Sequence, residues 1–299
     1  MKNLLLVLLF VAFGVGGDTP KLKPYILAYE SSAQLTEIRS TLKTNLKAEG
    51  FTILGEYKPA KDASRWLIIV GNPSLTSAVQ KVGGLTAFAA SLRVAITKES
   101  GVWKVTYTNP YYWGNAYFRD DYPKVEPFYK KVHSAFIRAM KKSGTFKGTF
   151  FGSKKGVDLD DLRDYQYMVA MPDFDDVVEL EDFDSYNDAV AKIDANLKKG
   201  IAGVKKVYAI KIPGKNLKLY GIALTGSEGE SEFMPKIDLG SPKHTAFLPY
   251  EILVNDDEVV MLHGRFRIAV SFPDLTMGTF SKIMSTPGNI EDALEKLCE

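Results

Sequence analysis

Apolar positions along the first half of the chain recur at two spacings, which predicts strands and amphipathic helices in mixed order. The helical spacing is clearest between Leu35 and Leu46, where apolar residues fall at intervals of three and four. The expected elements are, in order, a strand at 25–30, a helix over 35–46, strands at 51–57 and 66–70, a helix over 74–82, a hairpin within 92–118 and a helix over 124–140. Neighbouring strands with short connections indicate an α+β fold, an antiparallel sheet covered by helices in the order βαββαββα.

A strand–turn–strand pattern that ends at a proline occurs twice in the chain. The first occurrence lies within 92–118, where Asn109-Pro110 follows the second strand. The second lies within 248–280, where Phe272-Pro273 follows the second strand. The apolar stretches WLIIVGN and LYGIALT lie at nearly the same offset as the two hairpins. We interpret this recurrence as a tandem duplication that gives two similar domains.

The second half has the same mixture of spacings. The elements expected there are a strand at 177–183, a helix over 185–200, strands at 204–212 and 217–224, a weaker helix over 228–237, a hairpin of strands at 247–254 and 259–272, and closing helices over 277–284 and 289–297. We therefore place the first domain at 18–140, a linker that docks on its neighbours at 141–165, and a diverged second domain at 166–299.

The first residues have the layout of a secretory signal. Lys2 precedes an apolar run over 4–15, and small residues follow it before polarity begins at Asp18. The run is shorter than the roughly 20 residues that a spanning helix needs. We predict a signal peptide at 1–17, export to a periplasm or the exterior, and no stable membrane span after cleavage. The alternative is that the segment stays as an uncleaved anchor.

Composition excludes some classes of protein. Formal net charge is only +2 and the basic residues are scattered, so we expect no nucleic-acid partner. Apolar residues make up 45% of the chain, which is enough for an ordinary core in each domain. Cys298 is the single cysteine, so an intramolecular disulfide is impossible. The sequence does not indicate an oligomeric state.

The region 158–184 is rich in aspartate and glutamate. Asp158-x-Asp160-Asp161 has the start of a calcium loop but lacks the central glycine and the closing glutamate. We interpret the region as a solvated acidic linker and strand edge and predict no metal site. A weak site for a divalent cation is the alternative.

Aromatic residues with polar tips follow the first hairpin, and they form the first candidate site. Such residues just beyond a sheet edge can line a pocket for an apolar or ring-bearing ligand, with Arg119 binding an anionic end. The alternative is that they cover the end of the sheet as core. The candidate ligand-binding residues are Asn109, Tyr111, Tyr112, Trp113, Asn115 and Arg119, with Tyr107, Tyr117 and Phe118 beside them.

A second candidate site is the basic alternation His263-x-Arg265-x-Arg267. Within the expected strand, a period of two puts these three side chains on one sheet face, where they could bind a carboxylate, a phosphate or a sulfate-like group. The alternative is a solvated polar face.

Catalytic and cofactor motifs are missing from the sequence. It contains no Gly-x-Ser-x-Gly elbow, phosphate loop or dinucleotide fingerprint. The three histidines, His133, His244 and His263, are far apart and none lies in a catalytic or zinc-binding spacing. We therefore predict no catalytic residue and no cofactor, and we leave open whether the protein is an enzyme while favouring a protein that is not.

Several short motifs resemble the prokaryotic family of domain of unknown function 302. They are the helix that ends in EGFTILGEY, the apolar strand that ends at Gly71-Asn72-Pro73, and the paired strands that lead to Thr108-Asn109-Pro110. The second half looks like a diverged copy. The family's Leu-Pro-Cys hairpin start is Ser91-Leu92-Arg93 here and Leu248-Pro249-Tyr250 in the second copy. The resemblance implies an α+β fold, and it supports no thiol chemistry.

Three classes of function follow from these patterns. We expect a small-molecule ligand or a protein partner of the cell envelope to bind without catalysis, at the aromatic ends of the sheets or between the copies. One alternative is an enzyme that uses Arg119 or His263 with carboxylates from elsewhere. The other is an envelope interaction module that presents its acidic segment to a partner.

Overall fold

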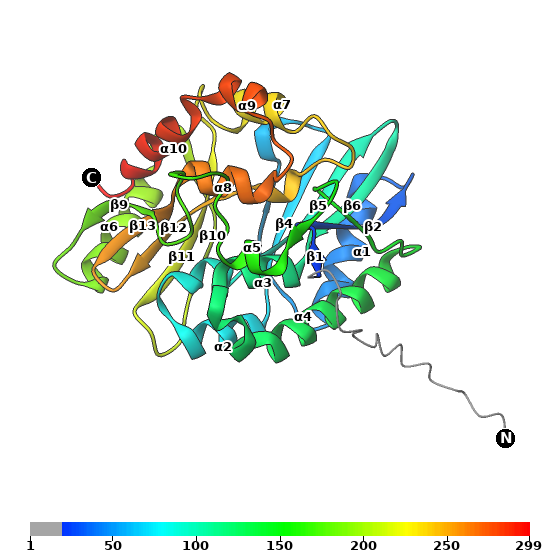
Figure 1. The fold of residues 1–299 in the computed structure, drawn as a ribbon, viewed down its shortest axis with the longest axis horizontal. Coiled ribbons are helices and arrows are strands. Elements are labelled where there is room, and N and C mark those ends of the chain that lie inside the picture. Colours follow the sequence, from blue (N-terminus) through cyan, green and yellow to red (C-terminus); the bar gives the residue numbers. More distant parts are fainter. Residues whose placement is uncertain (1–19) are drawn as a thin grey trace.

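A computed structural model describes residues 20–299, so the expected signal peptide lies outside the described residues. Two antiparallel sheets of five or more strands lie side by side, each with helices packed against it (Figure 1). The α+β class and the antiparallel pairing that the sequence predicts are therefore confirmed.

The first sheet has the strand order β3-β4-β5-β6-β2-β7. Its strands are β2 (Tyr25–Ser31), β3 (Thr52–Tyr57), β4 (Arg65–Gly71), β5 (Leu92–Glu99), β6 (Val102–Thr108) and β7 (Thr149–Phe151). Its helices are α1 (Leu35–Ala48), α2 (Pro73–Val82), α3 (Pro110–Phe118) and α4 (Tyr122–Ser143), with 3₁₀ turns η1 (Pro59–Lys61), η2 (Gly84–Ala89) and η3 (Arg119–Asp121). The helices α1 and α2 both pack against α4, so these three form one layer on the sheet (Figure 1).

The second sheet has the strand order β10-β11-β12-β13-β9. Its strands are β9 (Val177–Asp182), β10 (Val204–Lys211), β11 (Leu217–Leu224), β12 (Tyr250–Asn255) and β13 (Glu258–Leu262). Its helices are α6 (Tyr186–Lys199), α7 (Glu230–Ile237), α8 (Gly264–Ser271), α9 (Met277–Phe280) and α10 (Thr286–Glu295), with 3₁₀ turns η4 (Thr245–Phe247) and η5 (Ser281–Ile283). Matching β2 to β6 with β9 to β13 turns the order of one sheet into that of the other, apart from β7.

The segment between the sheets is part of the folded structure. The strand β7 extends the first sheet beside β2. The short strand β8 (Val157–Asp158) pairs with β1 (Lys21–Leu22), and α5 (Leu159–Arg163) follows it. The region that the sequence marks as a linker thus supplies a strand to the first sheet and packs on α3 through α5.

Two local predictions are wrong. The residues 259–272 do not form one strand, because β13 ends at Leu262 and α8 begins at Gly264. His263 Nδ1 accepts from the backbone N–H of Arg265 and so satisfies a free donor at the helix start, as a capping residue does. The sequence also predicts no helix at α3, where Asn109 caps the start in the same way and Pro110 occupies the first turn.

The two halves share one continuous hydrophobic core. The turn η2 of the first half packs on β11 and β12, and η4 of the second half packs on β5 of the first, so the contacts are reciprocal. Gly55 of β3 lies directly against β10, where an added Cβ would stand 2.2 Å from the carbonyl oxygen of Val207. This packing makes the halves one body with a seam between them. Among residues 20–299, no helix has the length and apolar character to cross a membrane.

Candidate functional site

A cavity of about 540 Å³ lies along the seam between the halves. Three stretches of chain and the single residue Lys23 form its walls. The three stretches are the end of β7 with the residues after it, the loop that leads from α7 to η4, and the segment from the end of α8 to α9. The cavity is therefore formed mainly by two parts of the chain. One is the linker at 141–165, here called the connecting segment, and the other is the second half.

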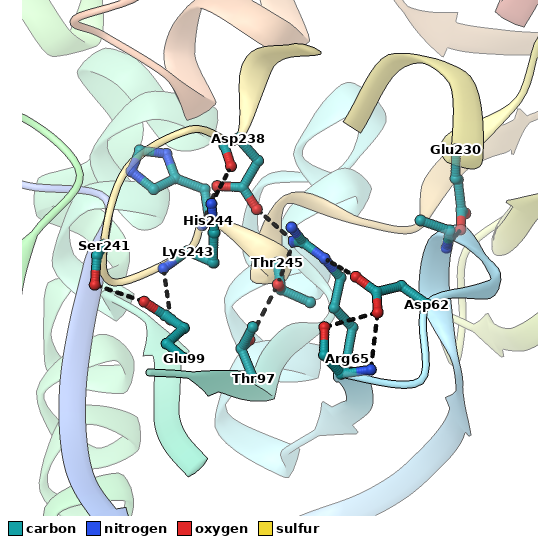
Figure 2. A network of polar contacts seen from close by, with 12 residues as sticks. Asp62, Arg65, Thr97, Glu99, Glu230, Asp238, Ser241, Lys243, His244 and Thr245 are labelled. Carbon is teal, nitrogen blue, oxygen red and sulfur yellow. Dashed lines mark hydrogen bonds and ion pairs between the residues drawn. The ribbon is translucent and has the colours of Figure 1, made fainter. Parts of the chain in front are cut away.

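The loop from α7 to η4 is held to the first sheet by a buried ion pair. Arg65 of β4 donates to the Asp238 carboxylate, and its second partner is the Thr245 hydroxyl at 2.7 Å (Figure 2). The other oxygen of Asp238 accepts from the backbone N–H of His244 at 2.8 Å. Asp62 completes the network by accepting from the Arg65 Nε at 3.1 Å. Both ends of the loop are thus fixed on one arginine.

Glu99 fixes the middle of the same loop. Its carboxylate accepts from the Ser241 hydroxyl at 2.6 Å and from the backbone N–H of Lys243 at 2.9 Å (Figure 2). The Lys104 amine lies 3.2 Å from the same carboxylate. The loop wall of the cavity is therefore part of an ordered polar network.

His244 presents a ring nitrogen at the cavity. Its Nδ1 lies 3.1 Å from the carbonyl oxygen of Ser271, and the ring stacks on Phe272 with centroids 4.6 Å apart. The ring points away from the Arg65–Asp238 pair (Figure 2). In the described part of the chain, Nε2 has no hydrogen-bond partner, and His244 borders the cavity. Burial lowers the pKa of His244, so the neutral imidazole is favoured.

Asp274 fixes the connecting segment at the opposite wall. Its carboxylate accepts from the backbone N–H of Lys154 at 2.6 Å and from the Ser153 hydroxyl at 3.3 Å. The Lys23 amine donates to the carbonyl of Lys154 at 3.2 Å. Because each of these charged groups already has a backbone partner, they act first as anchors of the wall.

Apolar side chains give the cavity a hydrophobic lining. Phe151 and Phe272 are buried beside His244. Phe150 and Leu239, in contrast, are 47% and 62% exposed although they are large hydrophobic residues. A ligand between them would remove apolar surface from water, which is the main driving force for binding to such cavities.

The aromatic residues predicted to line a ligand pocket lie in the core at the seam. Tyr112 and Trp113 are almost fully buried, and neither borders this cavity. The Tyr112 hydroxyl donates to the carbonyl of Val270 at 2.7 Å, and the Trp113 indole donates to the carbonyl of Pro24 at 3.0 Å. Their polar tips hold α3 against α8 and against Pro24, which precedes β2. A ligand role for them stays a prediction.

The other predicted residues around α3 also have structural partners. Asn109 caps α3 and Asn115 accepts from the Arg163 Nε at 3.0 Å. Tyr111 is half-buried and packs on the His133 ring, 4.5 Å between centroids. Arg119 pairs with Asp164 and Asp175 of the acidic region. These contacts tie the acidic region to the first half.

The basic alternation does not form one face, because its three residues lie on the first turns of α8. His263 caps that helix, Arg265 is exposed, and Arg267 is buried. The Arg267 guanidinium donates to the carbonyls of Phe247 and Pro249 at 3.0 and 2.9 Å. Its donors are therefore occupied by the protein itself.

Arg267 belongs to a second polar network that is sealed inside the seam. Glu251 of β12 forms ion pairs with Arg93 of β5 and, at 3.3 Å, with Arg267. The hydroxyl of Tyr208 also donates to Glu251, and the hydroxyl of Tyr117 accepts from Arg267 at 3.0 Å. All three charged side chains are almost fully buried. This network joins the halves and borders none of the cavity described above.

Sequence reasoning missed His244, Leu239 and Phe150 as site residues. The sequence shows His244 only as one of three scattered histidines. Nothing in a sequence marks Phe150 and Leu239 as exposed, because exposure depends on what the fold leaves uncovered. No group of three or more potential metal ligands is assembled anywhere in residues 20–299.

Part of the chain is similar to a solved structure. The crystal structure of an uncharacterised conserved protein, DUF302, from Bacillus stearothermophilus matches with 19% sequence identity and a TM-score of 0.34. The match covers 40% of this chain and 98% of that chain. No family model and no curated protein matches the chain. The match spans the length of about one predicted copy, and the resemblance of the second copy stays a prediction.

Proposed function

We propose that the protein is an exported, non-catalytic binding protein that takes a small molecule into the cavity along its seam. The single observation that carries this proposal is the cavity itself. It has about 540 Å³, within the range of small-molecule sites, and its walls combine exposed apolar side chains with one accessible imidazole nitrogen.

The fixed walls support binding without catalysis. The loop from α7 to η4 is held by Arg65 and Glu99, and the connecting segment is held by Asp274. A preformed site loses less conformational freedom when a ligand binds. Among residues 20–299, no nucleophile or carboxylate is hydrogen-bonded to the imidazole ring, whereas a catalytic triad requires both.

We further propose that the halves are tandem copies of one unit. Their strand order, which matches apart from β7, supports this, as do the turns of both hairpins, where Ser100 and Asp256 have φ values of 49° and 57°. Related domains that pack together commonly place a ligand between them. The cavity lies at such a junction.

A cavity-filling variant tests the proposal. Gly240 borders the cavity, an added Cβ there meets nothing within 4 Å, and the residue does not require a left-handed backbone. In Gly240→Phe the ring can occupy the ligand's space. Gly288 on α10 has the same freedom and is exposed away from the cavity, so Gly288→Phe is the matched control.

Both variants and the wild type would be purified from the native compartment and analysed by native mass spectrometry. We expect a bound small molecule in the wild type and in Gly288→Phe, and at least about a tenfold lower occupancy in Gly240→Phe. Equal occupancy in all three proteins, or no ligand in any of them, contradicts the proposal.

A further inference from the structure

We infer that His244 selects a neutral ligand that has an aromatic or similarly apolar body and one hydroxyl or N–H group, which donates to the His244 Nε2. This inference rests on the proposed function, since it names the class of molecule that the seam cavity binds.

The hydrogen-bond partner of Nδ1 determines which ring nitrogen is the acceptor. A backbone carbonyl oxygen can only accept, so Nδ1, which lies 3.1 Å from the oxygen of Ser271, must carry the hydrogen. In the neutral ring the hydrogen is then absent from Nε2, which is left with a lone pair. Nε2 has no protein partner in the described part of the chain and His244 borders the cavity, so Nε2 can accept from a ligand there.

The surroundings of the ring hold it in place and favour its neutral form. Tyr25 and Phe272 lie on it at 4.9 and 4.6 Å between centroids. The charged groups that act on the ring are Asp238, Asp274 and Lys243. Burial outweighs the two carboxylates and lowers the pKa of His244, so at neutral pH the ring accepts at Nε2.

The walls around this acceptor determine the body of the ligand. Phe151 and Phe272 stand beside the imidazole, and the exposed Phe150 and Leu239 add apolar surface to the same open cavity. A ring-bearing molecule fills such a space with offset or edge contacts. An acceptor that the bound ligand covers also discriminates strongly, because a ligand without the donor leaves Nε2 buried and unpaired.

An anionic ligand is the competing class. Lys23 borders the cavity, and its amine has donors left beside the one given to the Lys154 carbonyl. A carboxylate could pair with that amine. The experiment therefore includes an anionic probe of the same size.

Three small probes with the same methyl-substituted benzene ring distinguish a neutral donor ligand from an anionic one. Toluene has no donor, 4-methylphenol has a neutral hydroxyl donor, and 4-methylbenzoate has an anionic acceptor. Each would be titrated at pH 7.5 into the full-length mature protein while backbone amide shifts are followed by NMR. We expect 4-methylphenol to bind about tenfold more tightly than toluene, and 4-methylbenzoate to bind no better than toluene.

His244→Phe keeps an aromatic ring between Tyr25 and Phe272 and removes the acceptor. In this variant we expect toluene to bind as in the wild type and the preference for 4-methylphenol to vanish. In the wild type, acidification through the pKa of His244 puts a hydrogen on Nε2 and should remove the same preference. A long-range ¹⁵N–¹H spectrum of the imidazoles gives an independent measure, and we expect the hydrogen of neutral His244 on Nδ1.

The outcomes distinguish the two proposals. Equal binding of toluene and 4-methylphenol, tighter binding of 4-methylbenzoate, or a hydrogen on Nε2 overturns the assignment of His244 and leaves the seam cavity as a binding site. Failure of all three probes to shift amides around the cavity overturns the assignment together with the proposed function.

Discussion

Two polar networks join the halves of this molecule, and they differ in what lies beside them. The sealed network of Arg93, Glu251 and Arg267 is enclosed by protein on all sides. The open network, built on Arg65 and Asp238, holds a loop whose other face borders the cavity. Both networks pair charged residues from the two halves, so the residue types alone do not show which network lies beside a cavity.

This contrast indicates which part of the seam can bind a ligand. In the sealed network the charges of Arg93 and Arg267 are paired with Glu251 inside the protein, so the network stabilises the seam. The open network fixes the backbone of the loop and leaves Leu239 and the imidazole of His244 available. We conclude that the open network positions the site.

Glu251→Gln should have the largest effect on stability. Removing the carboxylate charge leaves two buried guanidinium groups without their counter-charge, which costs about 3 to 5 kcal/mol. Chemical denaturation monitored by circular dichroism would measure the free energy of unfolding. Glu126→Gln, which removes one partner of an exposed pair with Lys130, is the control and should cost less than about 1 kcal/mol. Similar losses in both variants would show that the sealed network does not hold the seam.

Arg65→Met should lower the stability less than Glu251→Gln does, and it should lower the affinity of the cavity for its ligand. It removes the donor to a fully buried Asp238 carboxylate, for about 2 to 3 kcal/mol in the free energy of unfolding. Because Arg65 anchors both ends of the loop, the affinity of the cavity for 4-methylphenol should also fall at least about tenfold. Isothermal titration calorimetry with that probe would measure it. Unchanged affinity at the predicted loss of stability would contradict a positioning role for the open network.

Glu230, at the start of the helix that leads into the loop, should give a pH-dependent effect. Burial raises the pKa of this carboxyl to about 7, although Tyr57 and two backbone N–H groups donate to it. A pKa raised in the folded state stabilises the protein at low pH, and this stability is lost as pH rises through about 7. Between pH 5 and 8.5 the wild type should therefore lose up to about 3 kcal/mol relative to Glu230→Gln.

The measurement for Glu230 is the slope of unfolding free energy against pH in the two proteins. The side-chain amide introduced by Glu230→Gln does not titrate, so the slope of the variant lacks this contribution whatever its absolute stability. Parallel slopes across that range would show that the Glu230 carboxyl keeps an ordinary pKa.

Filling the cavity should affect stability least. The side chain in Gly240→Phe points into open space, so the free energy of unfolding without ligand should change by no more than about 0.5 kcal/mol. Thermal unfolding of ligand-free Gly240→Phe and Gly288→Phe would measure it. A large loss confined to Gly240→Phe would mean that the loop packs more tightly than the cavity implies.

Much of the fold could be predicted from the sequence, because hydrophobic spacing reports local structure. The strands and helices of the first half up to β6 are close to their expected positions, as are β10, β11 and α6. The failure at 259–272 has a local cause. His263, Arg265 and Arg267 fit a strand face and a helix start equally well by spacing, and the capping bond that favours the helix is visible only in three dimensions.

The site could not be predicted in the same way. Binding of a ligand between the copies is among the expectations from the sequence, but the residues at the cavity are not. His244 reaches it through a loop held by Arg65, which is far away in sequence. Tyr112 and Trp113 look like binding residues because aromatic tips are common in pockets, and here the seam buries them. Tertiary contacts of this kind leave no local pattern.

A crystal structure of the mature protein, purified from its native compartment without added ligand, tests the central claim most directly. Our account predicts density for a small molecule between Phe151, Phe272 and Leu239, with one donor atom within hydrogen-bond distance of the His244 Nε2. An empty seam cavity, with ligand density at α3 or at another surface, would contradict it.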